Sequence, residues 1–319
     1  MSVMELRLRS SVRARHGEIP AELASALARR GIEAVAAPDG TITFPGVDGD
    51  VRLRLTDDGA TLDVRGPETV DEHNEAGWIA HNVLAPLVEA LLPERVGDWI
   101  TDRWARQPSG GAACEGYRDP THHRPSFGAI LSALQLQPDD VLLEIGCGGG
   151  AFLAEALRSG CRAAAIDHSV EMVELAREVN ASAIADGRLE ISEGKAEQLP
   201  FADGSFTCAA MMQVFFFLDA PRALAECRRV LRPGGRIAVF TVSEEARGTP
   251  AAPEPMASRG RFYTDEELVR LAHNAGFPVA SVTHPDLARY ARAAGLAEDV
   301  VELFAQGTNA GQLLLARDA

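Results

Sequence analysis

The chain has 319 residues, 46% of them hydrophobic and 24% charged, which is typical of an ordinary globular protein with room for two domains. Its formal net charge of −15 argues against a nucleic-acid partner, because an acidic protein is repelled by the phosphate backbone. None of the five cysteines are spaced as C-x-x-C, which disfavours a disulfide framework or a structural zinc site and favours a cytoplasmic protein. Because the sequence has neither a signal-peptide pattern nor an apolar run of ~18 residues, we expect no membrane association.

Residues 1–104 predict a small α+β domain. Short strands are expected at Glu5–Arg9, Thr41–Phe44, Val51–Leu55 and Thr61–Arg65, and helices at Pro20–Arg30, Glu68–Leu92 and Glu94–Trp104. Strands followed by helices favour an antiparallel sheet with helices on one side. His73 and His81 lie about two turns apart, not four residues apart, so we expect no metal there. The sequence leaves open whether this domain presents substrate, forms a homodimer or packs at an active-site mouth.

Residues 105–120 contain Pro, Gly and Ser without periodicity and are interpreted as a linker. From residue 121 to 319, strands and helices alternate, which predicts one domain built on a parallel α/β sheet. Strands are expected at Val141–Ile145, Arg162–Ile166, Leu189–Ser192, Phe206–Met211 and Arg236–Val242. Helices are expected at Ala151–Arg158, at Val170–Val179 behind an N-cap at Ser169, from Asp219 to Leu231, and after the capping box Thr264–Glu267.

A glycine-rich loop, Glu144–Gly150 (EIGCGGG), connects the first of these strands to a helix. Glycines there permit a tight turn and let a ligand approach the backbone, and the following helix N-terminus attracts an anionic group. Asp167 follows the next strand, 21 positions after Gly146, where a carboxylate can accept hydrogen bonds from ribose hydroxyls. Taken alone, this pattern also satisfies the dinucleotide fingerprint G-x-G-x-x-G/A, and such a loop can be purely structural.

Four stretches resemble, in order and at matching distances, the motifs of class I SAM-dependent methyltransferases. Glu144–Gly150 resembles the family's E/D-x-G-x-G-x-G loop, and Glu193–Phe201 (EGKAEQLPF) its "GDAExLPF" loop. Ala202–Thr207 (ADGSFT) resembles the lead-in to the fourth strand, and Leu231–Arg236 (LRPGGR) the "LkPGG" turn before the fifth. The resemblance covers roughly residues 125–317. It implies a Rossmann-like seven-stranded sheet, S-adenosyl-L-methionine (SAM) as cofactor and S-adenosyl-L-homocysteine as product.

In that family the glycine loop faces the methionyl part of SAM, the acid after the second strand holds the ribose, and the "DA" loop frames the adenine. By position, the resemblance implies cofactor contacts at Glu144, Gly146, Gly148, Gly150, Asp167, His168, Met172, Lys195, Ala196 and Glu197. Lys195 departs from the pattern, since the family often has an Asp there that can accept from the adenine amino group, whereas lysine only donates. Either Glu197 or a carbonyl accepts instead, or this contact is absent.

Methyl transfer from an activated sulfonium requires alignment rather than an obligatory catalytic constellation. Tyr117, His122 and His123 precede the first helix of the domain and are candidates for a base or a substrate contact; the alternative is a linker facing water. Gln213 follows the fourth strand, at the carboxyl edge where ligands bind, and is predicted to line the cofactor pocket or else to cap the strand.

Residues 243–263 form a long Pro- and Ala-rich segment of the kind that often makes a lid. Phe216, Arg261 and Tyr263 are candidate substrate contacts, against the alternatives of core packing for the phenylalanine and loop anchoring for the other two. In the family the last two strands, here about Pro278–Thr283 and Gln312–Ala316, often pair. This chain inserts a helical stretch, Leu287–Ala305, between them, which could form an acceptor pocket or a dimer contact.

The sequence therefore predicts a methyltransferase with a small-molecule acceptor, with a secondary metabolite as the favoured class, and with no nucleic-acid or membrane partner. An NAD(P)-dependent oxidoreductase is the first alternative, although the "LRPGG" and "AEQLPF" stretches have no role in it. A SAM-binding protein without transferase activity is the second.

Overall fold

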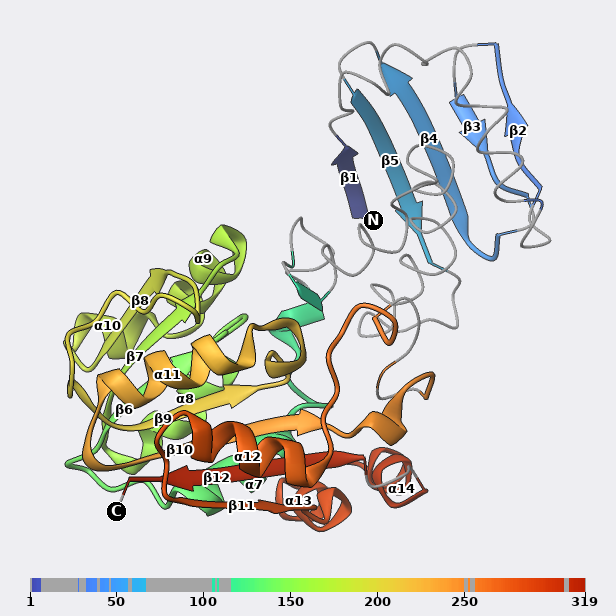
Figure 1. The fold of residues 1–319 in the computed structure, drawn as a ribbon. Coiled ribbons are helices and arrows are strands. Elements are labelled where there is room, and N and C mark those ends of the chain that lie inside the picture. The colour runs from blue at the N-terminus through green and yellow to red at the C-terminus, as the bar shows by residue number, and fades with distance from the viewer. Residues whose placement is uncertain are drawn as a thin grey trace. The chain divides into compact units, whose positions relative to one another are not determined.

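The computed structural model describes residues 2–6, 28, 33–38, 41–45, 47–56, 59–66, 105, 106, 108, 116–249, 252, 256–306 and 310–318. The chain divides into two compact units, Met1–Ala105 with Ser109–Gly116 and Arg106–Pro108 with Tyr117–Ala319 (Figure 1). The expected helices over 20–30, 68–92 and 94–104 lie outside the described residues, apart from residue 28, and so do His73 and His81.

The described part of the N-terminal unit is an antiparallel sheet with the order β1-β5-β4-β3-β2. Its strands are β1 (Ser2–Leu6), β2 (Val35–Ala36), β3 (Thr41–Thr43), β4 (Asp50–Thr56) and β5 (Gly59–Arg65). Leu53 lies opposite Leu62, and both are fully buried, whereas Arg52 and Arg54 are exposed, so one face of the sheet is apolar. The first strand was expected at Glu5–Arg9 but begins at Ser2. Its position follows from long-range pairing with β5, where Ser2 faces Val64, rather than from the local alternation.

The second unit contains the seven-stranded sheet predicted from the sequence, with the order β11-β12-β10-β9-β6-β7-β8. Its strands are β6 (Val141–Ile145), β7 (Arg162–Asp167), β8 (Leu189–Glu193), β9 (Phe206–Met212), β10 (Leu231–Val242), β11 (Val279–Thr283) and β12 (Gly311–Arg317). β12 runs antiparallel to both of its neighbours, and the other pairs are parallel. The carboxyl ends of β6, β7, β9 and β10 therefore meet at one edge of the sheet.

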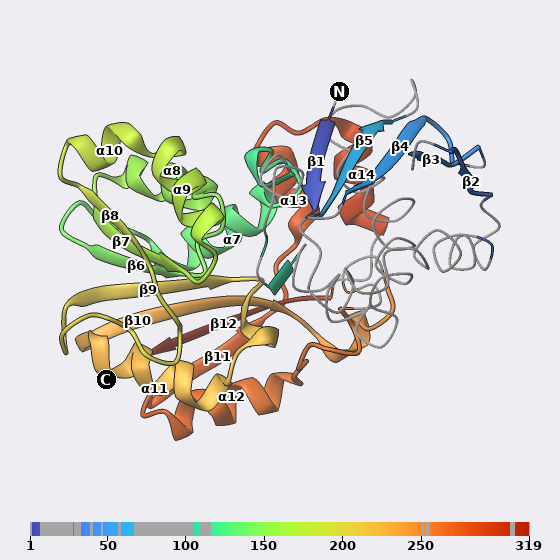
Figure 2. The ribbon, with the colours of Figure 1, turned by 90° about the horizontal axis from the view of Figure 1, so that it is seen from above.

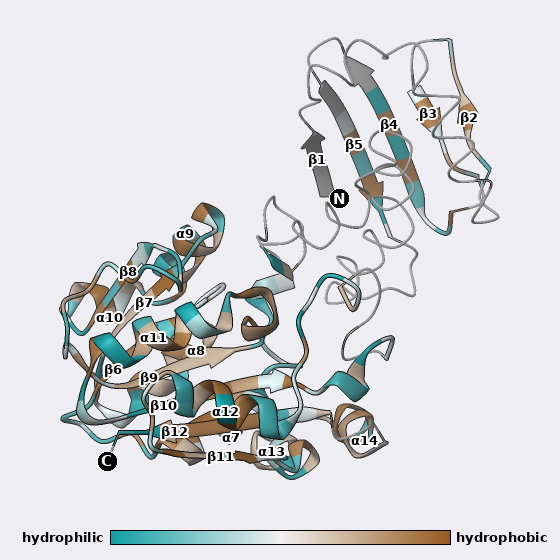
Figure 3. Ribbon diagram, in the orientation of Figure 1, coloured by the Kyte–Doolittle hydropathy of each residue, from teal (hydrophilic) through white to brown (hydrophobic). Residues whose placement is uncertain are grey.

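Helices cover both faces of this sheet, as Figure 2 shows. They are α7 (Arg124–Leu134), α8 (Ala151–Ala156), α9 (Val170–Val179), α10 (Ala181–Ala185), α11 (Ala220–Val230), α12 (Asp265–Asn274), α13 (Leu287–Ala293) and α14 (Glu298–Gln306). On one face, Phe127 of α7 meets Phe152 of α8 edge to face, with ring centroids 5.6 Å apart. On the other face, Leu224 of α11 and Leu268 of α12 are fully buried over the strands. Hydrophobic residues follow the central strands in Figure 3.

Local signals predicted several element ends correctly. The capping box is present, with Glu267 N–H donating to Thr264 Oγ1 and Thr264 N–H to Glu267 Oε2. Two expectations were wrong in detail. β10 begins at Leu231, not Arg236, because Leu231 pairs with Phe206 of β9 before an irregularity in the register. The expected single helix over 287–305 is a pair, α13 and α14, and Gly295 at φ +70° supplies the left-handed turn after α13.

The amino ends of three strands are joined by one buried carboxylate. Asp140 accepts from both nitrogens of the Arg236 guanidinium, at 2.7 and 3.2 Å, and from the Thr207 hydroxyl. Burial of Asp140 would raise its pKa, but these donors outweigh burial and lower the pKa to about 2. This anchor lies at the edge of the sheet opposite to the glycine loop.

Candidate functional site

The glycine loop leaves β6 at the carboxyl edge and is held close to β7. The N–H groups of Gly146 and Cys147 both donate to Ile166 O, at 2.8 and 3.0 Å. Gly146 and Gly150 have φ angles of +74° and +78°, which L side chains rarely adopt. A Cβ on Gly146 would lie 2.6 Å from Val214 Cγ1, so glycine is required here by space as well as by conformation.

Two buried carboxylates flank this loop. Asp167, 8% exposed, accepts from Gly148 N–H through Oδ2 and from Ser169 N–H through Oδ1, both at 2.9 Å. A carboxylate has about four acceptor positions, so roughly two remain for a ligand. Glu144 is 1% exposed, and its Oε2 has no partner among the described residues. Burial, together with the nearby charge of Asp167, raises the pKa of Glu144 well above its usual range. An unpaired buried oxygen calls for a donor, and a cationic one would also favour the charged carboxylate.

Tyr117 packs directly on the glycine loop. A Cβ on Gly148 would lie 3.1 Å from its ring, and one on Gly149 would lie 3.0 Å from its carbonyl oxygen. Burial, and then the charge of Asp167, raise the pKa of its phenol. Of the sequence-predicted catalytic candidates, Tyr117 is thus the one that the structure places in contact with the loop.

The two histidines lie at the start of α7. His122 is exposed, whereas His123 is the N-cap residue, and its Nδ1 is buried without a partner among the described residues. Burial, and then the neighbouring His122, lower the pKa of His123, so its imidazole is neutral at pH 7. A neutral imidazole with an unpaired nitrogen can accept a proton.

The residues expected around the adenine lie after β7 and β8. His168 is half-buried and its Nε2 bonds Arg106 O, while Met172 on α9 is fully buried. Gly194 N–H donates to the backbone oxygen of Asp167 at 2.9 Å, which holds the loop after β8 beside that acid.

The three predicted positions in this loop have different environments. Ala196 is buried among apolar residues, while Lys195 is exposed. Glu197 Oε1 accepts from Asp219 N–H at 3.1 Å, so part of its carboxylate is already engaged. The structure thus offers the backbone at Ala196, rather than the Lys195 side chain, to a ligand beside Asp167.

Gln213 follows β9 with a left-handed backbone, at φ +53°. Its N–H donates to Phe240 O at 2.8 Å, and the next residue, Val214, is the one that fills the space beside Gly146. A non-glycine residue in this conformation stores about 1 kcal/mol or more of strain, which is common at functional sites.

Two of the three candidate substrate contacts are engaged within the 243–263 segment. Phe216 is 4% exposed and stacks on Phe262 with centroids 5.6 Å apart, so it is a packing residue rather than an open pocket wall. Arg261 is exposed, and its N–H donates to Phe216 O at 2.7 Å. Tyr263 is half-buried against Phe215, and burial is the first cause that raises its pKa.

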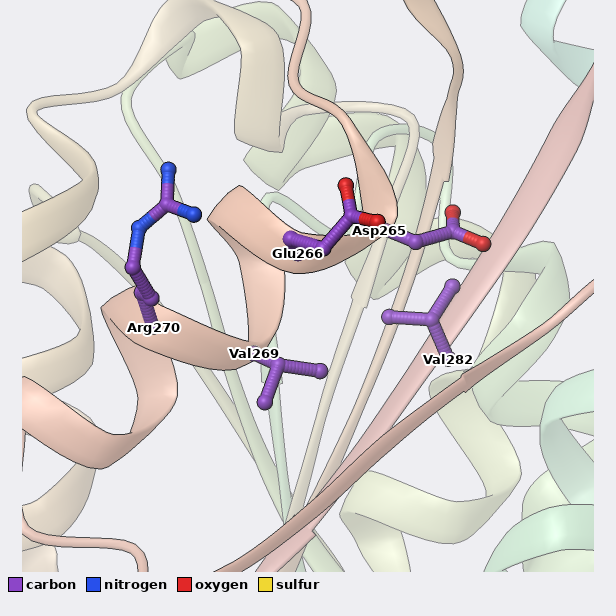
Figure 4. A pocket seen from close by; sticks show the side chains of 5 residues that line it. All are labelled: Asp265, Glu266, Val269, Arg270 and Val282. Atoms are coloured by element: carbon purple, nitrogen blue, oxygen red, sulfur yellow. The ribbon is translucent and has the colours of Figure 1, made fainter.

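A cavity of about 400 Å³ lies elsewhere, between α12 and β11, and is lined by Asp265, Glu266, Val269, Arg270 and Val282. Val269 and Val282 face each other across it in Figure 4. Three strands (β12, β10 and β9) lie between β11 and β6 in the sheet, so this cavity is separate from the glycine loop. It contains none of the predicted site residues.

The sequence analysis missed residues that brace the loop from a distance. Asn180, 5% exposed, donates through Nδ2 to Gly150 O at 2.9 Å and to Ala176 O at 3.0 Å. Arg229 of α11 donates to Leu199 O and Phe201 O, at 3.0 and 2.7 Å, and so holds the loop after β8. Neither residue has a local sequence signal, because its partners lie about 30 positions away.

The fold and the site define an α/β protein of the methyltransferase class. The described architecture is similar to that of a methyltransferase solved in complex with the Trm112 methyltransferase activator of Haloferax volcanii, with 21% identity, 64% of this chain and 92% of that chain covered, and a TM-score of 0.52. Residues 143–239 match the family model described as "Methyltransferase domain".

Curated relatives agree with this class. The chain is 30% identical over 200 residues to the O-methyltransferase cnsE of Penicillium expansum, covering 60% of this chain and 70% of that one. It is 38% identical over 168 residues to a 37.1 kDa protein in transposon TN4556 of Streptomyces fradiae, covering 48% of each. It is 39% identical over 122 residues to the malonyl-[acyl-carrier protein] O-methyltransferase of Pectobacterium atrosepticum, covering 38% of this chain and 46% of that one. For some of these relatives the match thus spans only about half of their length.

The chain therefore belongs to the class I SAM-dependent methyltransferase family. SAM is the cofactor that this family uses, and the oxidoreductase alternative loses its basis. No helix among the described residues has the length and apolarity needed to cross a bilayer, and no group of three potential metal ligands occurs among them.

Proposed function

We propose that the protein transfers a methyl group from SAM to a small-molecule acceptor, with a hydroxyl oxygen as the favoured nucleophile. The observation that carries this proposal is the pair of buried carboxylates beside the glycine loop, Glu144 with an unpaired oxygen and Asp167 with unused acceptor positions. Several relatives carry the name O-methyltransferase, which supports an oxygen acceptor. The net charge of −15 supports a small molecule rather than a nucleic acid.

The residues around the loop fit the parts of SAM. Asp167 would accept from the two ribose hydroxyls through the lone pairs that Gly148 and Ser169 leave free. Glu144 would receive the ammonium group of the methionyl part, which satisfies its unpaired oxygen and stabilises its charge. The Ala196 backbone would meet the adenine, and Gln213 would present its amide at the carboxyl edge of β9.

SAM, when bound, supplies a methyl group activated by a sulfonium. The chain's own task is to align an acceptor with that methyl and to exclude water. A hydroxyl acceptor must lose a proton, and we assign His123 as the candidate that takes it, since its imidazole is neutral and its Nδ1 is unpaired. Tyr117 and His122 remain as the neighbouring candidates.

The test has two stages. Calorimetric titration of the purified chain with SAM, S-adenosylhomocysteine and NAD should show binding of the first two only. Methyl-labelled SAM is then incubated with a panel of phenols, aliphatic alcohols and carboxylic acids, and label transfer is measured together with S-adenosylhomocysteine release. Absence of SAM binding at millimolar concentration would overturn the proposal. Binding without label transfer to any panel member would favour the non-transferase alternative instead.

His123 is tested in the same assay. His123→Gln should lower the rate constant for transfer to the acceptors found and should remove the fall in rate on the acid side of the pH profile. That fall is expected because protonation of the wild-type imidazole below its lowered pKa abolishes its function as a base. His122→Gln is the matched control and should retain both. An unchanged profile in His123→Gln would exclude this base.

A further inference from the structure

A short segment far from the cofactor motifs in sequence lies against the residues that follow Asp167. Arg106 O accepts from His168 Nε2, and Pro108 O accepts from Ser169 Oγ at 2.6 Å. Pro108 is buried, and Arg106–Pro108 belong to the same compact unit as the seven-stranded sheet. We call Arg106–Pro108 the strap. It was expected to be part of a linker, yet two adjacent hydrogen bonds hold it at the ribose end of the candidate site.

Ser169 is the residue in which three connections meet. Its N–H donates to Asp167 Oδ1 at 2.9 Å, and its Oγ accepts from Met172 N–H at 3.3 Å as the N-cap of α9. The hydroxyl has a single proton, and Pro108 O at 2.6 Å is a much closer acceptor for it than Glu171 Oε2 at 3.5 Å. At 1% exposure, Ser169 cannot replace these partners with water.

The chain returns to the same corner at Tyr117, whose ring packs on Gly148, the residue that donates to the other oxygen of Asp167. The next residue, Arg118, makes a two-pronged ion pair with Glu178 of α9, at 2.9 and 3.0 Å. The carboxylate of Asp167 thus has a strap contact through Ser169 on one side and the Tyr117 ring near the other.

We propose that Ser169 is a positioning residue that fastens the strap at the ribose end of the site and fixes the orientation of Asp167, so that the cofactor and its product leave slowly. This inference rests on the proposed function, because it takes Asp167 as the ribose acceptor. A ligand held by Asp167 would lie next to His168 and Ser169, and the strap bonds to both. Opening the strap breaks a buried hydroxyl–carbonyl hydrogen bond, which slows release by about 5- to 10-fold.

The test compares three variants. Ser169→Ala removes both the cap and the strap bond, and Ser169→Thr retains a hydroxyl for both. Thr264→Ala is the matched control, since Thr264 caps α12 through the same 3.3 Å contact with a backbone N–H and has no printed bond to the strap. The dissociation rate of labelled S-adenosylhomocysteine is measured by dilution into unlabelled product. Deuterium exchange of the peptide over 105–108 is followed with and without product.

We expect Ser169→Ala to release product 5- to 10-fold faster and to raise the KM for SAM more than it changes kcat. Ser169→Thr should restore both values. Thr264→Ala should lower Tm to a similar extent while product release stays unchanged. In Ser169→Ala the peptide over 105–108 should exchange faster even without ligand.

Equal product release in Ser169→Ala and wild type, with only Tm reduced, would overturn the inference and leave Ser169 as a helix cap. Unchanged exchange of the strap peptide would overturn it as well, and this readout does not depend on cofactor. If wild type binds no SAM, the proposed function fails, whereas SAM binding with Ser169-independent release refutes the strap alone.

Discussion

Replacing Asp167 with alanine tests the placement of the cofactor most directly. The carboxylate uses one acceptor position for Gly148 N–H and one for Ser169 N–H, both at 2.9 Å, which leaves about two for ribose hydroxyls. A hydrogen bond to a charged group contributes about 1.5–3 kcal/mol, so the loss of two at the lower value costs about 3 kcal/mol. We therefore expect the Kd for SAM to rise roughly 150-fold.

The same substitution leaves two backbone donors without their acceptor, so the free energy of unfolding should fall by about 2 kcal/mol. Affinity must therefore be measured by calorimetry well below the Tm of the variant. Asp140→Asn is the matched control, because it also weakens a buried carboxylate but at the opposite edge of the sheet. It should lose stability and keep SAM affinity. If Asp167→Ala binds SAM within about threefold of wild type, the ribose is not held by this carboxylate.

Three further outcomes follow from the geometry. Gly150→Ala should destabilise the protein by more than 2 kcal/mol, because its Cβ would lie 2.6 Å from Asn180 Nδ2 at φ +78°. Gly187→Ala, at φ +68° with nothing within 4 Å, should cost only about 1 kcal/mol in the same denaturant titration, and equal costs would contradict the argument. Gln213→Gly should unfold at higher denaturant than Gln213→Ala by about 1 kcal/mol, since only glycine relieves the left-handed backbone; no difference would mean that the residue is unstrained. The pKa of Asp140 is lowered to about 2, so its contribution of about 2 kcal/mol is present above pH 4 and is lost as the pH falls from 4 to 2. The stability difference between wild type and Asp140→Asn should vanish over that range, and a constant difference would refute this linkage.

Much of the second unit could be predicted because its signals are local. The strand Val141–Ile145 and the helix Val170–Val179 occur where the hydrophobic pattern predicted them. The capping box at Thr264 depends on a residue three positions away, and the glycine loop is a continuous stretch. Such features are fixed by neighbours in the chain, so the residues themselves contain the information.

The remaining features depend on contacts between distant segments. The first strand starts at Ser2 because of its pairing with β5, and β10 starts at Leu231 because of its pairing with β9. Phe216 was offered as a substrate contact, but the stacking partner Phe262 lies far along the chain and makes it a packing residue. No periodicity of a single segment encodes such pairings.

From the sequence alone came the family resemblance, the seven-stranded architecture and the expectation that Gly146 and Asp167 act together. The tertiary structure alone decided that Glu144 keeps an unpaired buried oxygen and that Ser169 joins a segment some 60 residues earlier to the same corner. The physical reason is that burial and hydrogen-bond satisfaction are properties of a place in space. They are set by every segment that packs there, whereas chain order specifies only the nearest neighbours.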